Sequence, residues 1–309
     1  MLAGPAPVWF LVMGLANLQH PTSKILHPLY FYLLVLRRTF VSTFEHHGFG
    51  IAKAAAYSSL LSFFPVLTSA GAILVQTKAQ FVSQTISEFL FEVIPPGTED
   101  LVRYQFAVKG QRPIFLLIAA AALSTWAASG VVRSLMEGFQ AAYHIEQGRP
   151  FFRNAGLSML LVVLSILPLL AACGLMLFGG YIDRLVVRLL AVDPLLTPVT
   201  SSWHLVSRLA RYGVAFAAAV GVTTLLYYFG PERRQRWTAV WRGGVLATAL
   251  WLIATAGFGW YVRNLANYNV LYGGVATSIA LLVWMYLMSL IALLGCEFNA
   301  QYERMTPGL

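Results

Sequence analysis

The chain has 309 residues, of which 58% are hydrophobic and only 11% carry a charge. Soluble domains average about 25% charged residues, so this composition excludes an ordinary soluble enzyme, and its hydrophobicity excludes a disordered chain. Two cysteines, Cys173 and Cys296, are too few for a secreted disulfide scaffold. The net charge of +9 is compatible with nucleic-acid binding or with the basic loops that orient membrane spans.

The N-terminal part of the chain is not predicted to cross the membrane, and residues 1–23 are either a poorly ordered extension or an interfacial helix. An apolar run within residues 1–23 is too short to span a bilayer and has no basic residue before it, so we predict no signal peptide. Residues 25–47 form an amphipathic helical pattern, which predicts an interfacial helix on the cytoplasmic side. We assign residues 1–53 to an N-terminal extension that ends in this helix. The hydrophobic residues that recur at helical spacing are Leu29, Leu33, Leu36, Phe40 and Phe44.

Six later stretches are long and apolar enough to cross a membrane as helices. They are continuously apolar rather than alternating, which favours helices over barrel strands. The sequence therefore predicts an all-α polytopic membrane protein, in which residues 54–304 form a six-transmembrane-helix bundle. Helical patterns at 82–93 and 182–189 predict further interfacial helices on the outer side. The six predicted spans are 54–77, 113–132, 155–181, 208–229, 243–262 and 274–296.

An even number of spans places both termini on the same side of the membrane. The short loop 232–236 reads Glu-Arg-Arg-Gln-Arg, and short basic loops stay in the cytoplasm. We therefore expect both termini in the cytoplasm. The charges lie in loops and at interfaces, so the positive balance is interpreted as topology and contact with anionic lipid headgroups, with no nucleic acid as partner.

The first predicted span carries a polar face that includes Tyr57, Ser58, Ser62 and Pro65. Proline removes a helix hydrogen bond and can kink the span. Two interpretations stay open: the hydroxyl groups satisfy freed backbone carbonyls, or the face lines a pathway through the bundle. In the second case Trp126 and Ser129 of the second span, with a TrpAlaAlaSerGly sequence at 126–130, are expected to face the same pathway.

The connection between the last two spans is polar and aromatic. Asn269, Tyr272 and Gly273 belong to a turn at 263–274, where glycine permits an unusual backbone. This turn is either an ordered outer hairpin with interfacial tyrosines or a surface that faces the substrate.

A third group of candidate residues is predicted at the cytoplasmic ends of the second and sixth spans. It consists of Arg133, Glu137, Glu297 and Asn299. Ionisable groups near the membrane are expected to have a partner, so one hypothesis is that Glu297 pairs with Arg133 and closes the cytoplasmic side. The alternative is two separate interfacial charges.

Small residues recur every four positions in the fourth span, at Gly213, Ala217 and Gly221. Such ladders let helix backbones approach closely. They predict a helix contact along this face.

Catalytic motifs are not found in the sequence. The six histidines form no His-x-His or His-Glu-x-x-His pattern, and no glycine-rich phosphate loop with lysine is present. The protein is therefore predicted to be no enzyme, with no catalytic residue, no metal and no cofactor.

Several motifs together identify a resemblance. The residues are AlaAlaAlaTyrSerSerLeuLeuSerPhePhePro at 54–65, the 126–130 sequence quoted above, TrpMetTyr at 284–286 and LeuGlyCysGluPheAsnAla at 294–300. Over about 37–304 the chain resembles the YihY/BrkB family of bacterial inner-membrane proteins, although Cys296 and Phe298 stand where a small residue and leucine are usual. The resemblance implies six spans, an inner-membrane location and cytoplasmic termini. Relatives have been labelled ribonuclease BN or virulence factor, and this sequence lacks the His/Asp metal cluster that a hydrolytic nuclease needs.

We expect the protein to move or export an amphipathic or anionic envelope molecule such as a lipid. Its expected partners are the bilayer, anionic lipids and other envelope proteins. The alternatives are a membrane scaffold for envelope integrity and an ion-coupled transporter. A coherent polar cavity between spans one, two and six favours transport, whereas a tightly packed bundle favours the scaffold.

Overall fold

The computed structural model describes residues 28–76, 114–145, 148–189, 199–264 and 275–306. These residues form seven α-helices and no strand. Six of the helices are long and apolar enough to cross a membrane, so the predicted all-α fold with six spans is confirmed. The helices are α2 (Pro28–Glu45), α3 (Gly48–Gln76), α6 (Ile114–Ala142), α7 (Phe151–Leu189), α8 (Val199–Phe229), α9 (Trp237–Asn264) and α11 (Val275–Met305).

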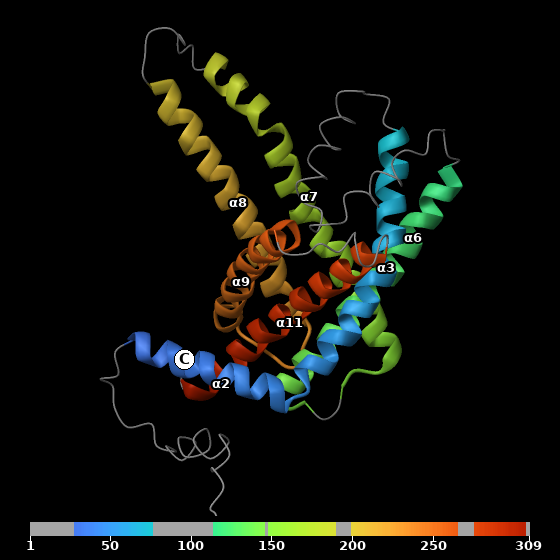
Figure 1. Ribbon diagram of the computed structural model, residues 1–309, viewed down its shortest axis with the longest axis vertical. Coiled ribbons are helices and arrows are strands. Elements are labelled where there is room, and N and C mark those ends of the chain that lie inside the picture. Colours follow the sequence, from blue (N-terminus) through green and yellow to red (C-terminus); the bar gives the residue numbers. More distant parts are fainter. Residues whose placement is uncertain (1–27, 77–113, 146–147, 190–198, 265–274, 307–309) are drawn as a thin grey trace, which may run out of the picture.

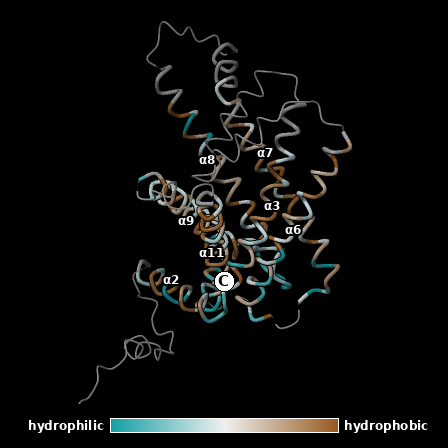
Figure 2. The backbone as a smooth tube through the Cα atoms, turned by 45° about the vertical axis from the view of Figure 1, so that its right-hand side comes forward, coloured by the Kyte–Doolittle hydropathy of each residue, from teal (hydrophilic) through white to brown (hydrophobic). Residues whose placement is uncertain are grey.

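The six long helices form a ring. Each packs against its neighbours in the sequence, and α11 closes the ring by packing on α3. Figure 1 shows α3 and α6 as one pair and α7 and α8 as another, while α9 lies beside the lower end of α8 and α11 runs from α3 past α9 toward α2. Helix α2 lies across one end of the bundle and packs against α11. Hydrophilic residues gather around that end, whereas the long helices are mostly hydrophobic (Figure 2).

Five helices extend beyond the predicted spans at this same end, among them α3, which begins at Gly48, and α7, which begins at Phe151. Helix α6 continues to Ala142, α9 begins at Trp237 and α11 continues to Met305. The prediction placed boundaries at the first charged residues, which mark the depth of the apolar stretch. Backbone hydrogen bonding does not depend on lipid, so a helix continues through charged residues into the interface.

The predicted outer helix at 182–189 is not a separate element. It forms the last part of α7, which runs without a break for 39 residues. Gly179 and Gly180 keep their backbone N–H groups and so allow the helix to continue, and the next proline, Pro194, comes only after it ends. The other predicted outer helix, at 82–93, lies outside the described residues.

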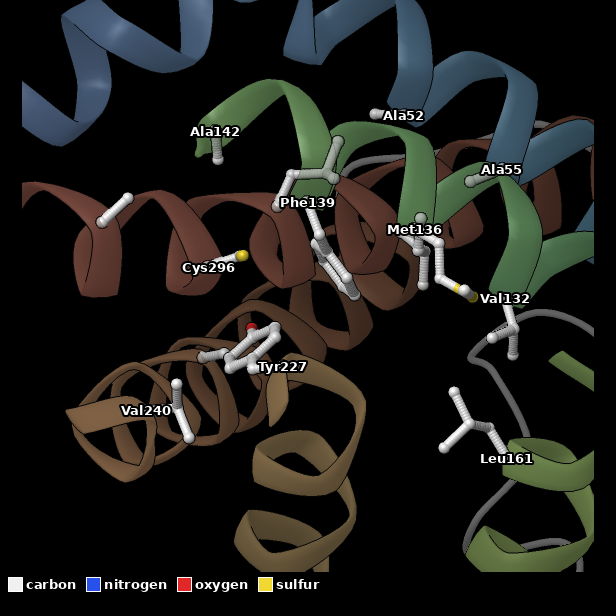
Figure 3. Close-up of a cluster of buried hydrophobic side chains, with 14 residues drawn as sticks. Ala52, Ala55, Val132, Met136, Phe139, Ala142, Leu161, Tyr227, Val240 and Cys296 are labelled. Carbon is white, nitrogen blue, oxygen red and sulfur yellow. The ribbon is translucent and has the colours of Figure 1, made fainter. Parts of the chain in front are cut away.

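A buried hydrophobic cluster holds the ring together near the end where α2 lies (Figure 3). The rings of Phe139 and Tyr227 meet edge to face with centroids 5.2 Å apart, and the Tyr227 hydroxyl donates to the Ala292 carbonyl at 2.7 Å. All six long helices contribute to this cluster, through residues such as Ala55, Met136, Leu161, Tyr227, Val240 and Leu293.

Helices α9 and α11 cross closely. Gly243 and Gly295 face each other there: a Cβ on Gly295 would lie 2.8 Å from the Gly243 carbonyl oxygen and 2.7 Å from the Ala247 Cβ. Only small residues permit this approach.

The predicted ladder in α8 does not make such a contact. A Cβ on Gly213 or Gly221 would meet nothing within 4 Å in the described structure, and Ala217 is exposed. That prediction is wrong, because small residues are frequent in membrane helices and their spacing alone does not tell which face meets a neighbour.

Helix α2 packs on the bundle with its small, hydroxyl-bearing face. Val35, Thr39, Ser42 and Thr43 are at most 8% exposed. The predicted apolar face points away from the bundle, with Phe40 and Phe44 at least 60% exposed. A helix with one face on protein and an apolar stripe left open suits the membrane interface.

Candidate functional site

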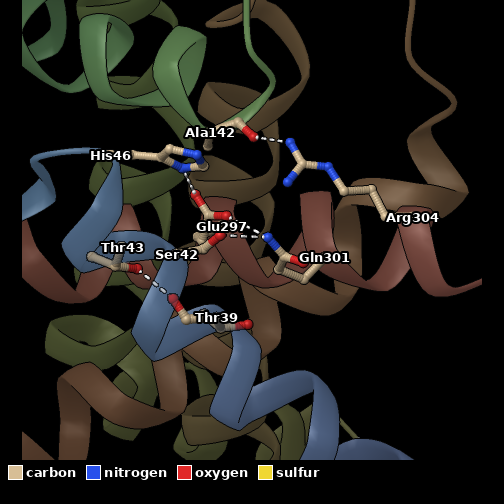
Figure 4. Close-up of polar contacts among 8 residues, drawn as sticks. All are labelled: Thr39, Ser42, Thr43, His46, Ala142, Glu297, Gln301 and Arg304. Carbon is tan, nitrogen blue, oxygen red and sulfur yellow. Dashed lines mark hydrogen bonds and ion pairs between the residues drawn. The ribbon is translucent and has the colours of Figure 1, made fainter. Parts of the chain in front are cut away.

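The end of the bundle where α2 lies is closed by hydrogen bonds between distant segments, and we call it the polar end. At its centre the buried Glu297 carboxylate is bound by His46 Nδ1 at 3.0 Å and by Gln301 Nε2 at 2.9 Å. Gln301 also donates to Ser42 Oγ at 2.8 Å. These contacts, drawn in Figure 4, tie α2 and the α2–α3 turn to α11.

Two more side chains of α11 extend the polar end to other helices. The Asn299 side chain accepts a hydrogen bond from the Gly243 N–H at 2.7 Å and donates to the Val240 carbonyl at 2.8 Å. Arg304 donates to the carbonyl of Ala142, the last residue of α6, at 2.8 Å. The carbonyl of Ala142 has no partner within its own helix, as at any helix C-terminus. Helix α11 therefore holds the ends of α6 and α9 together.

The connections that precede α7 and α9 meet at the polar end as well. Arg149 donates to the carbonyls of Gly230 and Pro231 at 2.8 and 3.1 Å. Burial lowers the pKa of Arg149 from its ordinary value, and the nearby Glu232 carboxylate opposes this shift. Arg233 pairs with Glu303 and lies over the Tyr143 ring, 4.9 Å from its centroid. The basic loop is thus fixed to both α6 and α11.

The predicted four-residue cluster is only partly assembled. Glu297 and Asn299 belong to the polar end, but Arg133 stacks over the Phe151 ring at 6.0 Å and Glu137 is exposed. The hypothesis that Glu297 pairs with Arg133 is wrong. The Arg133 side chain is half-buried at the edge of the buried face of α6 that holds Val132 and Met136.

Sequence reasoning missed the actual partners of Glu297. Gln301 follows it by four residues on the same helix face, which is a readable signal. His46 lies 251 residues away in the sequence, and no local pattern connects the two.

A second candidate site is a groove of about 320 Å³ between α3, α6 and α11. It is open on one side and lies between spans one, two and six, where the sequence analysis placed a possible pathway. Its lining is mostly apolar, which differs from the polar cavity considered there. The lining residues are Ser59, Ser62, Phe63, Val66, Val131, Leu135, Trp284, Met285, Met288, Ser289 and Ala292.

The few polar groups of the groove mostly serve their own helices. Ser59 donates to the Ala55 carbonyl at 2.8 Å, and Ser289 donates to the Met285 carbonyl at 2.9 Å. Such bonds leave the hydroxyl lone pairs available as acceptors. The Trp284 indole N–H is buried and has no partner among the described residues. The groove therefore offers an apolar surface with a few hydrogen-bonding positions.

The predicted pathway residues are distributed over several surfaces. Ser62 lines the groove, and Ser129 is buried in α6, where it donates to the Trp126 carbonyl at 2.6 Å. Tyr57 and Trp126 are 61% and 59% exposed on the outside of the bundle. The side chains of Ser58 and Pro65 are partly exposed on α3. The predicted residues Asn269, Tyr272 and Gly273 lie outside the described residues.

The histidines and carboxylates of the described ranges do not form a group of three that could hold a metal ion. The rings of His46 and His144 meet edge to face with centroids 4.8 Å apart. Together with Glu297, these histidines link the α2–α3 turn, the end of α6 and α11.

Comparison with known proteins agrees with this architecture. A profile of the virulence factor BrkB family matches residues 39–308. The putative ribonuclease-like protein YfkH of Bacillus subtilis is 28% identical over 82% of this chain and 90% of its own length. UPF0761 membrane proteins of Tolumonas auensis and Aeromonas salmonicida are each 26% identical, over 81% and 85% of this chain and 79% and 88% of their own lengths. No solved structure matches. With six candidate spans and a family match over most of its length, the chain is a membrane protein that belongs to the virulence factor BrkB family.

Proposed function

We propose that this protein binds an amphipathic envelope lipid in the groove between α3, α6 and α11 and moves it across or out of the membrane. The observation that carries the proposal is the groove itself, which is open on one side and mostly apolar. Its volume of about 320 Å³ lies at the lower end of the range of small-molecule sites. An acyl chain is the part of a lipid that such a lining accommodates.

The remaining groups of the groove suit the polar part of such a molecule. Trp284 offers an N–H donor without a partner in the described chain, and the serine hydroxyls can accept hydrogen bonds. Met285 and Met288 are flexible and polarizable, so they can adapt to different chain positions. This combination favours a lipid over a small hydrophilic solute.

The polar end is proposed to be the cytoplasmic end in the bacterial inner membrane, with both termini on that side. The basic loop at 230–236 lies there, and short basic loops are retained in the cytoplasm. In this arrangement the polar end closes the bundle toward the cytoplasm while the groove opens to the bilayer.

We propose no enzymatic activity, no cofactor and no nucleic-acid partner. The name of the Bacillus subtilis relative contains "ribonuclease-like", but the groove lining is apolar and carries no cationic side chain to bind a phosphodiester backbone. A scaffold that binds other envelope proteins is the second candidate. It is favoured by the bonded polar end, which would stay rigid in such a role.

A lipid-flipping assay tests the proposal. The full chain is reconstituted in vesicles with a fluorescent anionic phospholipid, and the loss of fluorescence on adding an impermeant reductant reports lipid that has crossed. Val66→Trp fills the groove and is expected to slow crossing at least about tenfold, because overpacking removes the space a ligand needs.

The matched control is Leu61→Trp on the same helix. Leu61 is 55% exposed and does not line the groove, so this variant is expected to behave as the wild type. Equal slowing by both variants, or no crossing by the wild type when other envelope proteins are supplied, contradicts transport through this groove. A rigid protein without crossing points to the scaffold.

A further inference from the structure

A small notch on the outside of the bundle combines groups from three helices. A Cβ placed on Gly130 of α6 would lie 3.9 Å from the Ser58 hydroxyl of α3 and 3.9 Å from a terminal guanidinium nitrogen of Arg133. The guanidinium also stacks on Phe151, the first residue of α7. The absence of a side chain at position 130 leaves space between a hydroxyl and a cation.

Neither polar group of the notch is occupied by another part of the described chain. Arg133 forms no ion pair with the described residues. Its guanidinium lies over the Phe151 ring, which is an uncharged partner. Glu137, one turn further along α6, is exposed. Ser59 donates a hydrogen bond to the Ala55 carbonyl, whereas the Ser58 hydroxyl forms none with the described residues. An ionisable residue within a span requires a counter-charge, and the notch has space for one.

The notch is distinct from the groove. Val131 and Leu135 line the groove, and Arg133 is two residues from each of them. At 3.6 residues per turn this places Arg133 about 160–200° around α6 from the groove residues. Arg133 therefore lies on the side of the helix opposite the groove, and the notch that it forms with Ser58 and Gly130 is half-buried.

The surroundings of the notch are those of a lipid-facing surface. Trp126, which lies about one helical turn before Gly130, is 59% exposed. Phe151 and Phe152 are 69% and 88% exposed. Arg133 is the first charged residue after the apolar stretch of α6, and charged residues at the end of such a stretch lie at the level of the lipid headgroups. The headgroup of a neighbouring lipid can therefore reach the notch from the side.

The geometry points to a binding site for the phosphate of an anionic phospholipid at Ser58, Gly130 and Arg133. The guanidinium binds phosphate oxygens with two parallel N–H groups, the Ser58 hydroxyl donates to a third oxygen, and the acyl chains lie along the exposed aromatic side chains. The site links α3, α6 and the start of α7. It does not depend on transport, and it stands even if the flipping experiment fails.

Lipid binding by the full chain in neutral detergent tests this site. Phosphatidylglycerol or phosphatidylcholine is added at equal concentration, and the bound lipid is counted by native mass spectrometry while thermal unfolding is followed in parallel. We expect the wild type to hold phosphatidylglycerol in preference and to unfold at a higher temperature with it, since a ligand of the folded state stabilises it. Arg133→Gln is expected to weaken this binding about tenfold, the scale of a lost charge-assisted hydrogen bond.

Three further variants separate the site from general charge effects. Ser58→Ala leaves the charge intact and is expected to weaken binding about threefold, the scale of a neutral hydrogen bond. Arg133→Lys keeps a point charge and is expected to fall between the wild type and Arg133→Gln. Arg234→Gln removes the same charge from the exposed loop at 230–236 and is expected to retain the preferred lipid.

The results that overturn the assignment are equally distinct. If Arg133→Gln binds phosphatidylglycerol as the wild type does, or loses no more than Arg234→Gln, the notch is not the site. If soluble glycerol phosphate displaces the lipid, the site binds a soluble anion and the lipid assignment is wrong. If Arg133→Gln fails to fold, Ser58→Ala tests the assignment instead. This variant weakens lipid binding only if the lipid occupies the notch.

Discussion

The polar end and the arm formed by α7 and α8 are built from similar apolar helices but differ in how they are held. Of the 18 residues in the apolar stretch of α11, 39% are buried, against 11% in the corresponding stretch of α7 and 6% in that of α8. The C-terminal part of α11 is bonded to α2, α6 and α9 through Gln301, Arg304 and Asn299. Helix α8 instead exposes Leu205, Leu209 and Tyr212.

The difference follows from the solvent. In lipid, two apolar helix faces gain little by leaving the bilayer, so helices associate through close packing and hydrogen bonds. Both are concentrated at the polar end, at the Gly243–Gly295 crossing and around Glu297. The polar end therefore stabilises the fold, and the rest of the bundle is free to present the groove and the notch to lipid.

The largest expected effect is the loss of the Glu297 carboxylate. Glu297→Ala leaves His46 and Gln301 without their acceptor in a buried site, at a cost of about 1–3 kcal/mol for each orphaned group. We expect a large drop in the apparent melting temperature in detergent and poor recovery from the membrane. Glu297→Gln keeps an acceptor oxygen and is expected to lose less.

Glu303→Gln is the control for this change. Its pair with Arg233 joins two side chains that are 37% and 42% exposed, and exposed pairs contribute about 0–1 kcal/mol. A Glu303→Gln protein that melts as low as Glu297→Ala contradicts the central place of Glu297 in the polar end.

The second prediction compares two glycines of α9. A methyl group on Gly243 would collide with the Gly295 carbonyl oxygen and approach the Asn299 side chain, whereas one on Gly257 would meet nothing within 4 Å in the described structure. Overpacking costs about 1–3 kcal/mol, so Gly243→Ala is expected to lower the melting temperature clearly. Gly257→Ala is expected to leave it unchanged or slightly raised, since alanine favours helix. If the two variants melt at the same temperature, α9 and α11 do not pack tightly against each other at Gly243.

The fold could be predicted from the sequence because its main signal, an apolar stretch of about 20 residues, is local. The ends of the helices could not be predicted from the sequence. The first charged residue, such as Arg133 or Glu297, marks the end of the apolar stretch and not the last backbone hydrogen bond of the helix. The face that α2 presents to the bundle was missed for a related reason. Hydrophobic residues such as Phe40 indicate burial, but in a membrane protein lipid can cover them as well as protein.

The candidate sites could not be predicted in full, because their contacts join residues that lie far apart in the sequence. Glu297 and Asn299 of the predicted cluster both lie at the polar end, but Glu297 binds a histidine from the turn between α2 and α3. The groove was expected to be polar because serines recur in α3. The structure shows why they mislead: Ser59 and Ser62 donate to carbonyls of their own helix, so their number does not measure the polarity of the space they face.

The smallest expected effect concerns pH at the polar end. His144 follows α6, its ring meets that of His46, and Arg304, His46 and Glu297 lie near it. The His144 side chain is exposed, yet the desolvation that its surroundings impose lowers its pKa, Arg304 and His46 lower it further, and Glu297 opposes them. Between this lowered pKa and the ordinary value of about 6.5, the unfolded state binds more protons, so stability falls as the pH falls through that window.

Without the His144 ring, the protein is therefore expected to lose less stability as the pH falls from about 7 to about 5. His144 and His47 both have positive φ, 54° and 56°, which asparagine tolerates, so His144→Asn and His47→Asn form a matched pair. Melting curves in detergent across this range measure the slope for each. The slope should decrease for His144→Asn and stay at the wild-type value for the exposed His47. If His144→Asn leaves the slope unchanged, the positive charges around this ring do not weaken the polar end.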